Sequence, residues 1–168
     1  MKIGLLSDTH GWIHPSLFDH FASCDEIWHA GDIGNIQTAD SLAGFKPLKA
    51  VFGNIDDYIV RSIFKESLRF TAGEMNIWMT HVGGTPGNYS PKVKSEIYSN
   101  PPDIFICGHS HVAKVMFDKR AGSLYINPGA AGYTGFHKYM TVIRFHIDNK
   151  KIHDMELIEL GERGKVKL

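Results

Sequence analysis

The sequence lacks several features that define whole classes of protein. Its 168 residues include only two cysteines, Cys24 and Cys107. Both lie in apolar surroundings, so we expect buried free thiols and no disulfide framework. No apolar run approaches the roughly 20 residues of a membrane-spanning helix, and Asp8 interrupts the N-terminal run before the core of an export signal can form. These absences predict a cytoplasmic protein with no membrane partner.

An excess of charge of one sign is also missing. The chain has 18 Lys and Arg residues against 18 Asp and Glu residues, so its formal net charge at pH 7 is zero. Without a positive field the protein has no general attraction to nucleic acid, and strong nucleic-acid binding is not expected. The 43% hydrophobic and 21% charged content is ordinary globular usage, so we expect one domain over residues 1–168.

What the sequence does contain is an alternation of apolar runs with short amphipathic segments. Strand-like runs occur at residues 3–7, 26–30, 49–52, 77–80 and 104–107. Helices are predicted at residues 15–23, 35–44 and 90–98. Hairpins are predicted from residues 68–71 with 75–80, 112–117 with 123–126, and 141–147 with 152–160. The order predicts an α/β (α+β) protein with two mixed sheets packed face to face and helices outside.

Short polar motifs follow five of the apolar runs. They are Asp8-Thr9-His10, Gly31-Asp32, Gly53-Asn54, His81 and Gly108-His109-Ser110-His111. Ligands gather where the carboxyl ends of strands meet in an α/β sheet, so these motifs are expected to converge. Their carboxylate, amide and imidazole groups, with no thiolate, favour Mn²⁺, Fe, Zn²⁺ or Ni²⁺ with positions open for water and substrate. The motifs therefore predict a two-metal centre.

The spacing within two motifs suggests how the ligands are presented. Asp8 and His10 are two residues apart, as are His109 and His111, and in an extended chain such side chains point to the same side. Each pair is therefore expected to present two ligands to one site. A glycine precedes three candidate ligands, where the missing Cβ is expected to let the backbone turn sharply: Gly31, Gly53 and Gly108.

Each motif taken alone also fits an ordinary structural role. Gly-Asp and Gly-Asn usually form turns, and a histidine after an apolar strand is commonly a buried core residue. The presence of all five motifs at strand ends favours the metal site. Of the remaining histidines, His14 and His137 lie on loops that can approach the site, and the others are expected at the surface or in packing.

In type, order and separation, the five motifs resemble the pattern of the calcineurin-like metallophosphoesterases: Asp-x-His, Gly-Asp, Gly-Asn, a lone His and Gly-His-x-His. The similarity spans Met1 to about Gly132 and is greatest to small single-domain phosphodiesterases of bacteria and archaea. It implies a four-layer αββα sandwich with a dinuclear site at the strand ends. In that family's arrangement Asp8, His10 and His111 bind one metal, Asn54, His81 and His109 bind the other, and Asp32 bridges both.

The resemblance also implies a reaction. Two cations about 3.5 to 4 Å apart lower the pKa of a shared water and neutralise charge on a phosphoryl group, so the expected nucleophile is a metal-bridging hydroxide. Asp32, Asn54 and His109 are the expected catalytic residues around it. The predicted activity is hydrolysis of a small, nucleotide-like phosphodiester, with Mn²⁺ as the expected ion and Ni²⁺, Fe or Zn²⁺ as alternatives.

Ile55 departs from the pattern of larger family members, which carry a proton-donating histidine after Gly-Asn. Because Ile55 cannot donate a proton, substrates whose leaving group departs without protonation, such as aryl diesters, are expected to be favoured. Substrate choice is expected to depend on the loops at residues 56–62 and 83–91. The side chains on these loops that are candidates for substrate contact are Arg61, Asn88 and Tyr89.

Other functions stay open at this stage. The retromer scaffolding subunit shares the implied fold and uses it for protein contacts, so an inactive interaction scaffold is the main alternative, followed by a phosphomonoesterase. A purely structural metal site is disfavoured because no cysteine is among the candidate ligands. Uncovered sheet edges in the C-terminal hairpin permit a homo-oligomer without requiring one.

Overall fold

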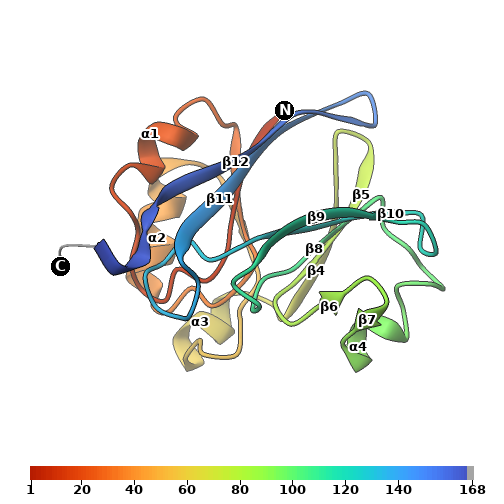
Figure 1. Cartoon of the computed structure of the whole chain (residues 1–168), viewed down its shortest axis with the longest axis horizontal. Helices are drawn as coiled ribbons and strands as arrows, with labels where there is room; N and C mark the ends of the chain where they lie inside the picture. The colour runs from red at the N-terminus through yellow and green to blue at the C-terminus, as the bar shows by residue number, and fades with distance from the viewer. Residues whose placement is uncertain (166–168) are drawn as a thin grey trace.

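The computed structural model describes residues 1–165, in which two five-stranded sheets pack face to face (Figure 1). The first sheet has the order β12-β11-β1-β2-β3. Its strands are β1 (Lys2–Leu6), β2 (Glu26–His29), β3 (Leu48–Ala50), β11 (Tyr139–Asp148) and β12 (Lys151–Glu162). The second sheet has the order β4-β5-β8-β10-β9. Its strands are β4 (Ser67–Ala72), β5 (Met75–Thr80), β8 (Ile104–Ile106), β9 (Ala113–Asp118) and β10 (Ser123–Pro128).

Helices cover the outer face of each sheet. On the first sheet, α1 (Leu17–Phe21) and α2 (Ile36–Phe45) bury Phe21 and Leu42 in one cluster with Leu6 of β1. On the second sheet, α4 (Pro91–Lys94) and the turns after it bury Val93 and Ile97 against Phe105. The layers therefore run helix, sheet, sheet, helix, and the predicted αββα sandwich is confirmed.

The alternation of side chains along β1 explains how one strand serves two hydrophobic layers. Ile3 and Leu5 are fully buried in the core between the sheets, together with Trp28. Leu6 points to the opposite face and joins the cluster under the helices, as the period of two in a strand requires. Each such buried side chain contributes about 1.5 to 3 kcal/mol relative to an exposed one, so both layers hold the strand in register.

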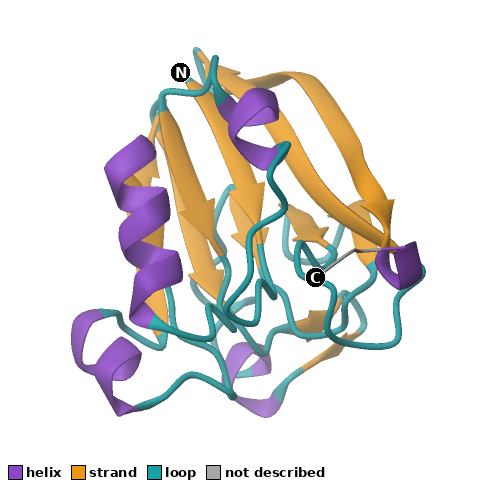
Figure 2. Ribbon diagram, turned by 90° about the vertical axis from the view of Figure 1, so that its left-hand side faces the viewer, coloured by secondary structure: helices purple, strands orange, loops and turns teal. Residues whose placement is uncertain are grey.

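The parallel strands decide where the functional motifs lie. Strands β1, β2 and β3 are parallel to one another, and so are β5, β8 and β10. The antiparallel pairs are β11 with β1 and with β12, β4 with β5, and β9 with β10. Parallel strands all end at the same edge of their sheet. Figure 2 shows strand arrows ending at a common edge, where the connecting loops gather.

Three local predictions were wrong. The helix predicted for residues 90–98 is limited to α4, because the hydroxyls of Ser95 and Ser99 bond to the carbonyls of preceding residues and the chain continues as turns. The loop at residues 56–62 contains a helix, α3 (Tyr58–Ile63), whose first turn is capped by the Asp57 carboxylate accepting from the Val60 N–H. The loop at residues 83–91 contains a small hairpin of β6 (Gly84–Thr85) and β7 (Asn88–Tyr89).

Both cysteines are free and buried, as predicted. Burial raises the pKa of Cys24 and raises that of Cys107 to about 12, so neither carries a reactive thiolate at neutral pH. Within residues 1–165, the helices are all too short or too polar to cross a membrane.

Candidate metal centre

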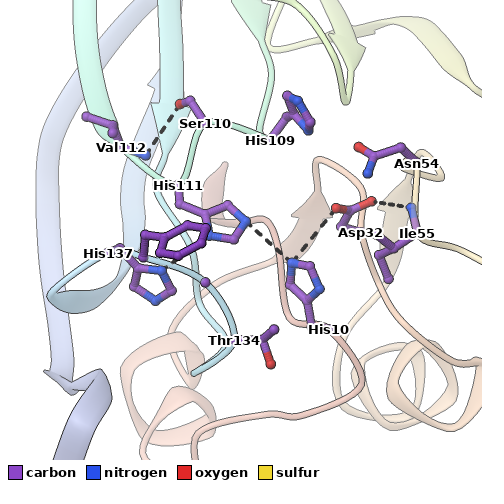
Figure 3. Close-up of a pocket in the computed structure, with 12 residues that line it drawn as sticks. His10, Asp32, Asn54, Ile55, His109, Ser110, His111, Val112, Thr134 and His137 are labelled. Carbon is purple, nitrogen blue, oxygen red and sulfur yellow. Dashed lines mark hydrogen bonds and ion pairs between the residues drawn. The ribbon is translucent and has the colours of Figure 1, made fainter.

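The seven candidate ligands follow the carboxyl ends of parallel strands from both sheets. Asp8 and His10 follow β1, Asp32 follows β2, Asn54 follows β3, His81 follows β5, and His109 and His111 follow β8. Residues separated by up to about a hundred positions in sequence are thereby brought to one place, which Figure 3 shows around a cavity.

The first group of close side chains consists of Asp8, His10 and His111, whose potential ligating atoms all lie within 4.8 Å of one another. The Nε2 atom of His111 lies 3.1 Å from Oδ1 of Asp8. It also lies 3.4 Å from Nε2 of His10, as Figure 3 shows. Two imidazole nitrogens and a carboxylate oxygen therefore face one point, which is the donor set of a divalent transition metal.

The second group consists of Asp32, His81 and His109. Oδ2 of Asp32 is 3.1 Å from Nε2 of His81 and 3.8 Å from Nε2 of His10, so this oxygen faces both groups. Its partner Oδ1 accepts a hydrogen bond from the Ile55 N–H at 3.0 Å, which fixes the carboxylate. Figure 3 places the Asn54 side chain beside Asp32 and on the same side as His109.

Two atoms at the centre are buried without a hydrogen-bond partner among the described residues: Oδ1 of Asp8 and Nε2 of His81. The ion-pair contacts of both atoms at 3.1 Å are not aligned as hydrogen bonds. Nδ1 of His81 lies 2.8 Å from the Ala30 carbonyl oxygen, which can only accept, so Nδ1 carries the proton and Nε2 presents a lone pair to the site. A buried, unpartnered polar atom costs about 1 to 3 kcal/mol, and cations between these ligands would remove that cost.

The electrostatics of the centre favour a bound positive charge. Burial works against ionisation of His81, but Asp32 and Asp8 outweigh it and raise the pKa of this imidazole. Burial likewise opposes the charge on Asp32, but His81 and the Ile55 N–H lower the pKa of the carboxyl group. Burial lowers the pKa of His10. A metal ion binding here would replace the proton that the carboxylates attract to His81.

The backbone at the ligands is not extended, contrary to the assumption made from the spacing of two, although Asp8 and His10 do fall in one ligand group. Five candidate ligands have positive φ angles: 56° at Asp8, 50° at His10, 54° at Asp32, 69° at His109 and 57° at His111. Residues with a Cβ rarely adopt this left-handed region, which is found where function requires it. The two histidines of the Gly-His-Ser-His motif fall in different groups, His109 in the second and His111 in the first.

The glycines before the ligands serve mainly to provide space. Of the three, only Gly31 has a positive φ, of 95°. A Cβ at Gly53 would lie 2.0 Å from Oδ1 of Asp32, and one at Gly108 would lie 1.9 Å from Oγ of Ser7. Bare backbone is therefore needed at Gly53 and Gly108 for the loops to pack around the carboxylates.

Two side chains that belong to none of the predicted ligand sets hold these loops together. The Asp56 carboxylate accepts hydrogen bonds from the N–H groups of Ile33, Gly34 and Gly53, and so joins the loops after β2 and β3. Asn127, near the end of β10, donates to the Gly108 carbonyl and the Ser110 hydroxyl and accepts from the Gly129 N–H.

Two cavities meet at the centre. We call the first, of about 410 Å³, the Phe136 cavity. It is lined by His10, Asp32, Asn54, Ile55, His109, Ser110, His111, Val112, Thr134, Gly135, Phe136 and His137. We call the second, of about 640 Å³, the Arg61 cavity; its walls include Asn54, Arg61, Ser67, Trp78, Thr80, His81, Ser90 and Lys92. Asn54 lines both.

The loop residues and histidines expected near the substrate differ in whether they line a cavity. Arg61 lines a cavity, whereas Tyr89 is buried and donates its hydroxyl to Asp118. Neither Tyr89 nor Asn88 lines the two cavities as they are described within residues 1–165. His137 lines the Phe136 cavity, but His14 is held by Ser16 at 2.8 Å and does not.

Comparison with known proteins identifies the family. Residues 1–150 match the model of the calcineurin-like phosphoesterase superfamily domain. The chain belongs to this superfamily. Its members are metal-dependent hydrolases of phosphoric esters, which agrees with the two groups of potential metal ligands.

Individual relatives agree with this assignment. A probable metallophosphoesterase of Methanothermobacter thermautotrophicus is 25% identical over 166 residues, covering 96% of this chain and 94% of the relative. The structure of an archaeal phosphodiesterase has a TM-score of 0.74 and 20% identity, covering 94% of this chain and 100% of that one. The structure of Vps29 from Entamoeba histolytica with Zn²⁺ has a TM-score of 0.70 and 18% identity, covering 96% of this chain and 100% of that one. Both structural likenesses show the shared fold.

The close approach of Gly53 to Asp32 predicts the effect of a single methyl group. Gly53→Ala should lower the free energy of unfolding by about 1 to 3 kcal/mol, because the added Cβ forces the two loops apart. Gly44→Ala is the matched control, since Gly44 lies in α2 and a Cβ added there would meet no atom within 4 Å; it should raise stability by roughly 0.5 to 1 kcal/mol. Urea unfolding of both variants measures this, and a Gly53→Ala protein as stable as the native one would contradict the packing described.

A second prediction concerns His29, which is fully buried behind the centre. Its Nδ1 accepts from the Gly31 N–H and its Nε2 contacts the Thr9 hydroxyl, and burial lowers its pKa to about 4. The unfolded histidine titrates near 6.5, so the stability due to neutral His29 is complete above that pH and is lost as the pH falls towards 4. The loss is on the order of 3 kcal/mol. Urea unfolding with chelator at about pH 7.5 and about pH 4 measures this loss. The free energy of unfolding should depend less on pH in His29→Gln than in the native protein. An equal pH dependence in the two proteins would refute the role of neutral His29.

Proposed function

We propose that this chain is a metal-dependent phosphodiesterase with two divalent cations at the centre. The observation that carries the proposal is the convergence of both ligand groups on Oδ2 of Asp32, next to buried and unpartnered atoms of Asp8 and His81. Burying these atoms without hydrogen-bond partners costs free energy. Cations bound between them would offset that cost.

The proposed ligand sets follow the two groups. Asp8, His10 and His111 would hold one cation, Asn54, His81 and His109 the other, and Asp32 would contact both. The nitrogen and oxygen donors suit Mn²⁺, which we propose as the working ion, and also Ni²⁺, Fe²⁺ and Zn²⁺. When bound, the two ions would activate a water molecule for in-line attack and offset the charge that develops on the phosphoryl oxygens.

The residues of the chain would orient the substrate and the ions. The bond from the Ile55 N–H to Oδ1 of Asp32 keeps Oδ2 directed at the centre. His109 and Asn54 border the cavity from which a phosphoryl group would enter. The side chain of Ile55 lines the same cavity and supplies no proton, so leaving groups that are stable as anions should depart most readily.

The lining of the Phe136 cavity favours a diester over a monoester. Ile55, Val112 and Phe136 are 45%, 62% and 103% exposed, and all three border the ligand groups. A phosphodiester carries a second organic substituent that can cover such apolar surface, whereas a monoester presents a second negative charge instead. This lining supports the diester as the preferred substrate.

An interaction scaffold is the second candidate function. It is supported by the shared fold with Vps29 and by the exposed apolar side chains around the centre, since such patches also serve protein contacts. The complete set of ligand-type side chains at the centre favours the enzyme.

Hydrolysis of bis(p-nitrophenyl) phosphate by the purified protein with Mn²⁺ tests the proposal. We expect cleavage that is abolished by chelator and faster than cleavage of p-nitrophenyl phosphate. Asp32→Ala should lower activity by at least about 100-fold, because even outer partners of metal ligands are worth about 10- to 100-fold. Asp40→Ala, on the exposed side of α2, is the control and should be fully active. Folded protein that cleaves neither ester with Mn²⁺, Ni²⁺, Fe²⁺ or Zn²⁺ would favour the scaffold.

A further inference from the structure

The two cavities differ in position and in chemistry. The Phe136 cavity contacts His10 and His111 of the first ligand group, whereas the Arg61 cavity contacts His81 of the second. Asn54 lines both, so a phosphoryl group placed at the centre has one cavity on each side of it. Each volume falls within the about 300 to 1,000 Å³ typical of sites for small organic ligands.

The Phe136 cavity suits a flat apolar group. The Phe136 ring is fully exposed, and Val112 and Ile55 are also exposed in the same cavity. A water-exposed aromatic ring next to a polar centre gains by stacking against a planar ligand group, and such stacking is a common way to bind a nucleobase.

The Arg61 cavity combines apolar walls, among them Trp78 and Val82, with charged and hydroxyl side chains. Arg61 donates to the carbonyls of Gly53, Asn54 and Asp56, and its guanidinium lies over the Phe52 ring. It is thereby held at the junction of the cavity with the centre and adds positive charge there. The hydroxyls of Thr80 and Ser90 also line this cavity and donate to the carbonyls of Glu66 and Val82, so their oxygens can accept from a ligand hydroxyl.

We propose that the substrate is a linear phosphodiester with two extended arms, a flat apolar one in the Phe136 cavity and a hydroxyl-bearing one in the Arg61 cavity. The inference rests on the proposed phosphodiesterase function and deepens it. A cyclic nucleotide has both ester bonds in a single arm and would fill one cavity only. The protein should therefore select linear, dinucleotide-like diesters over cyclic ones.

Binding of two thymidine compounds to the Mn²⁺-loaded protein tests this selection. By calorimetry, the linear dinucleotide thymidylyl-thymidine should bind at least tenfold more tightly than thymidine 3′,5′-cyclic phosphate. Ser90→Trp places a bulky ring in the wall of the Arg61 cavity and should reduce this preference to about twofold or less. Ser95→Trp, an identical change on the exposed end of the same segment, should keep it.

The outcomes separate this inference from the proposed function. Equal affinities in the native protein, or a preference unchanged by Ser90→Trp, would overturn the two-arm assignment even if bis(p-nitrophenyl) phosphate is cleaved. A preference that is lost in Ser90→Trp would uphold it even if no ester is cleaved, because the readout is binding.

A chain of hydrogen bonds behind the first ligand group carries a second, independent inference. Nε2 of His137 lies 2.9 Å from the Gly132 carbonyl oxygen, and its Nδ1 lies 3.3 Å from Nδ1 of His111 (Figure 3). The carbonyl only accepts, so Nε2 of His137 carries the proton and its Nδ1 can accept from His111. His111 then bears its proton on Nδ1 and directs an unprotonated Nε2 towards Asp8 and His10.

The geometry points to His137 as a positioning residue that fixes the tautomer and ring orientation of His111 for metal binding. A matched pair of variants tests this. His137→Asn keeps an acceptor oxygen where Nδ1 lies, whereas His137→Leu removes the acceptor. Mn²⁺ affinity, measured from the electron paramagnetic resonance signal of the free ion, should fall about 10- to 100-fold in His137→Leu. It should be largely restored in His137→Asn and unchanged in His14→Leu, which alters a histidine outside both cavities.

Two results would overturn the role of His137. Unchanged Mn²⁺ affinity in His137→Leu would show that His111 needs no partner. Equal weakening in His137→Asn and His137→Leu would show that the effect arises from packing and not from the hydrogen bond.

Discussion

The structure depends on the burial of two carboxylates, Asp8 and Asp32, at the junction of two sheets. Oδ1 of Asp8 and Oδ2 of Asp32 approach the same atom, Nε2 of His81, at 3.8 and 3.1 Å. Like charges in a buried place repel and lose hydration, so the arrangement is stable only with positive charge between them. In the proposed holoenzyme that charge is supplied by two cations.

The rest of the site can be understood as support for this arrangement. Five ligand positions have positive φ angles, and each such residue costs about 1 to 2 kcal/mol. The cost is tolerated because the loops are fixed from behind, by Asp56 between the loops after β2 and β3 and by Asn127 beneath the Gly-His-Ser-His loop. Rigid parallel strands in both sheets carry these loops, so the ligands are positioned before any ion binds.

The sequence was sufficient for the layers, the parallel strand ends and the ligand types, because these follow from apolar periodicity and side-chain chemistry. It was insufficient where a few atoms decide the structure. Helix α3 depends on one cap by Asp57, and α4 stops early because serine hydroxyls compete for its carbonyls. The left-handed φ angles at five of the ligands are not encoded by the spacing of the motifs. The roles of Asp56 and Asn127 depend on contacts between loops that only the assembled fold brings together.

The lack of a proton donor at position 55 is related to the apolar lining of the Phe136 cavity. An imidazole at this position would place a polar, titratable group in the wall that Val112 and Phe136 make apolar. Ile55 instead extends that wall and contributes its backbone N–H to Asp32. The chain thus exchanges acid assistance, worth about 10²- to 10⁴-fold where it operates, for apolar contact with the substrate. That exchange is favourable when the leaving group is stable as an anion and needs little protonation.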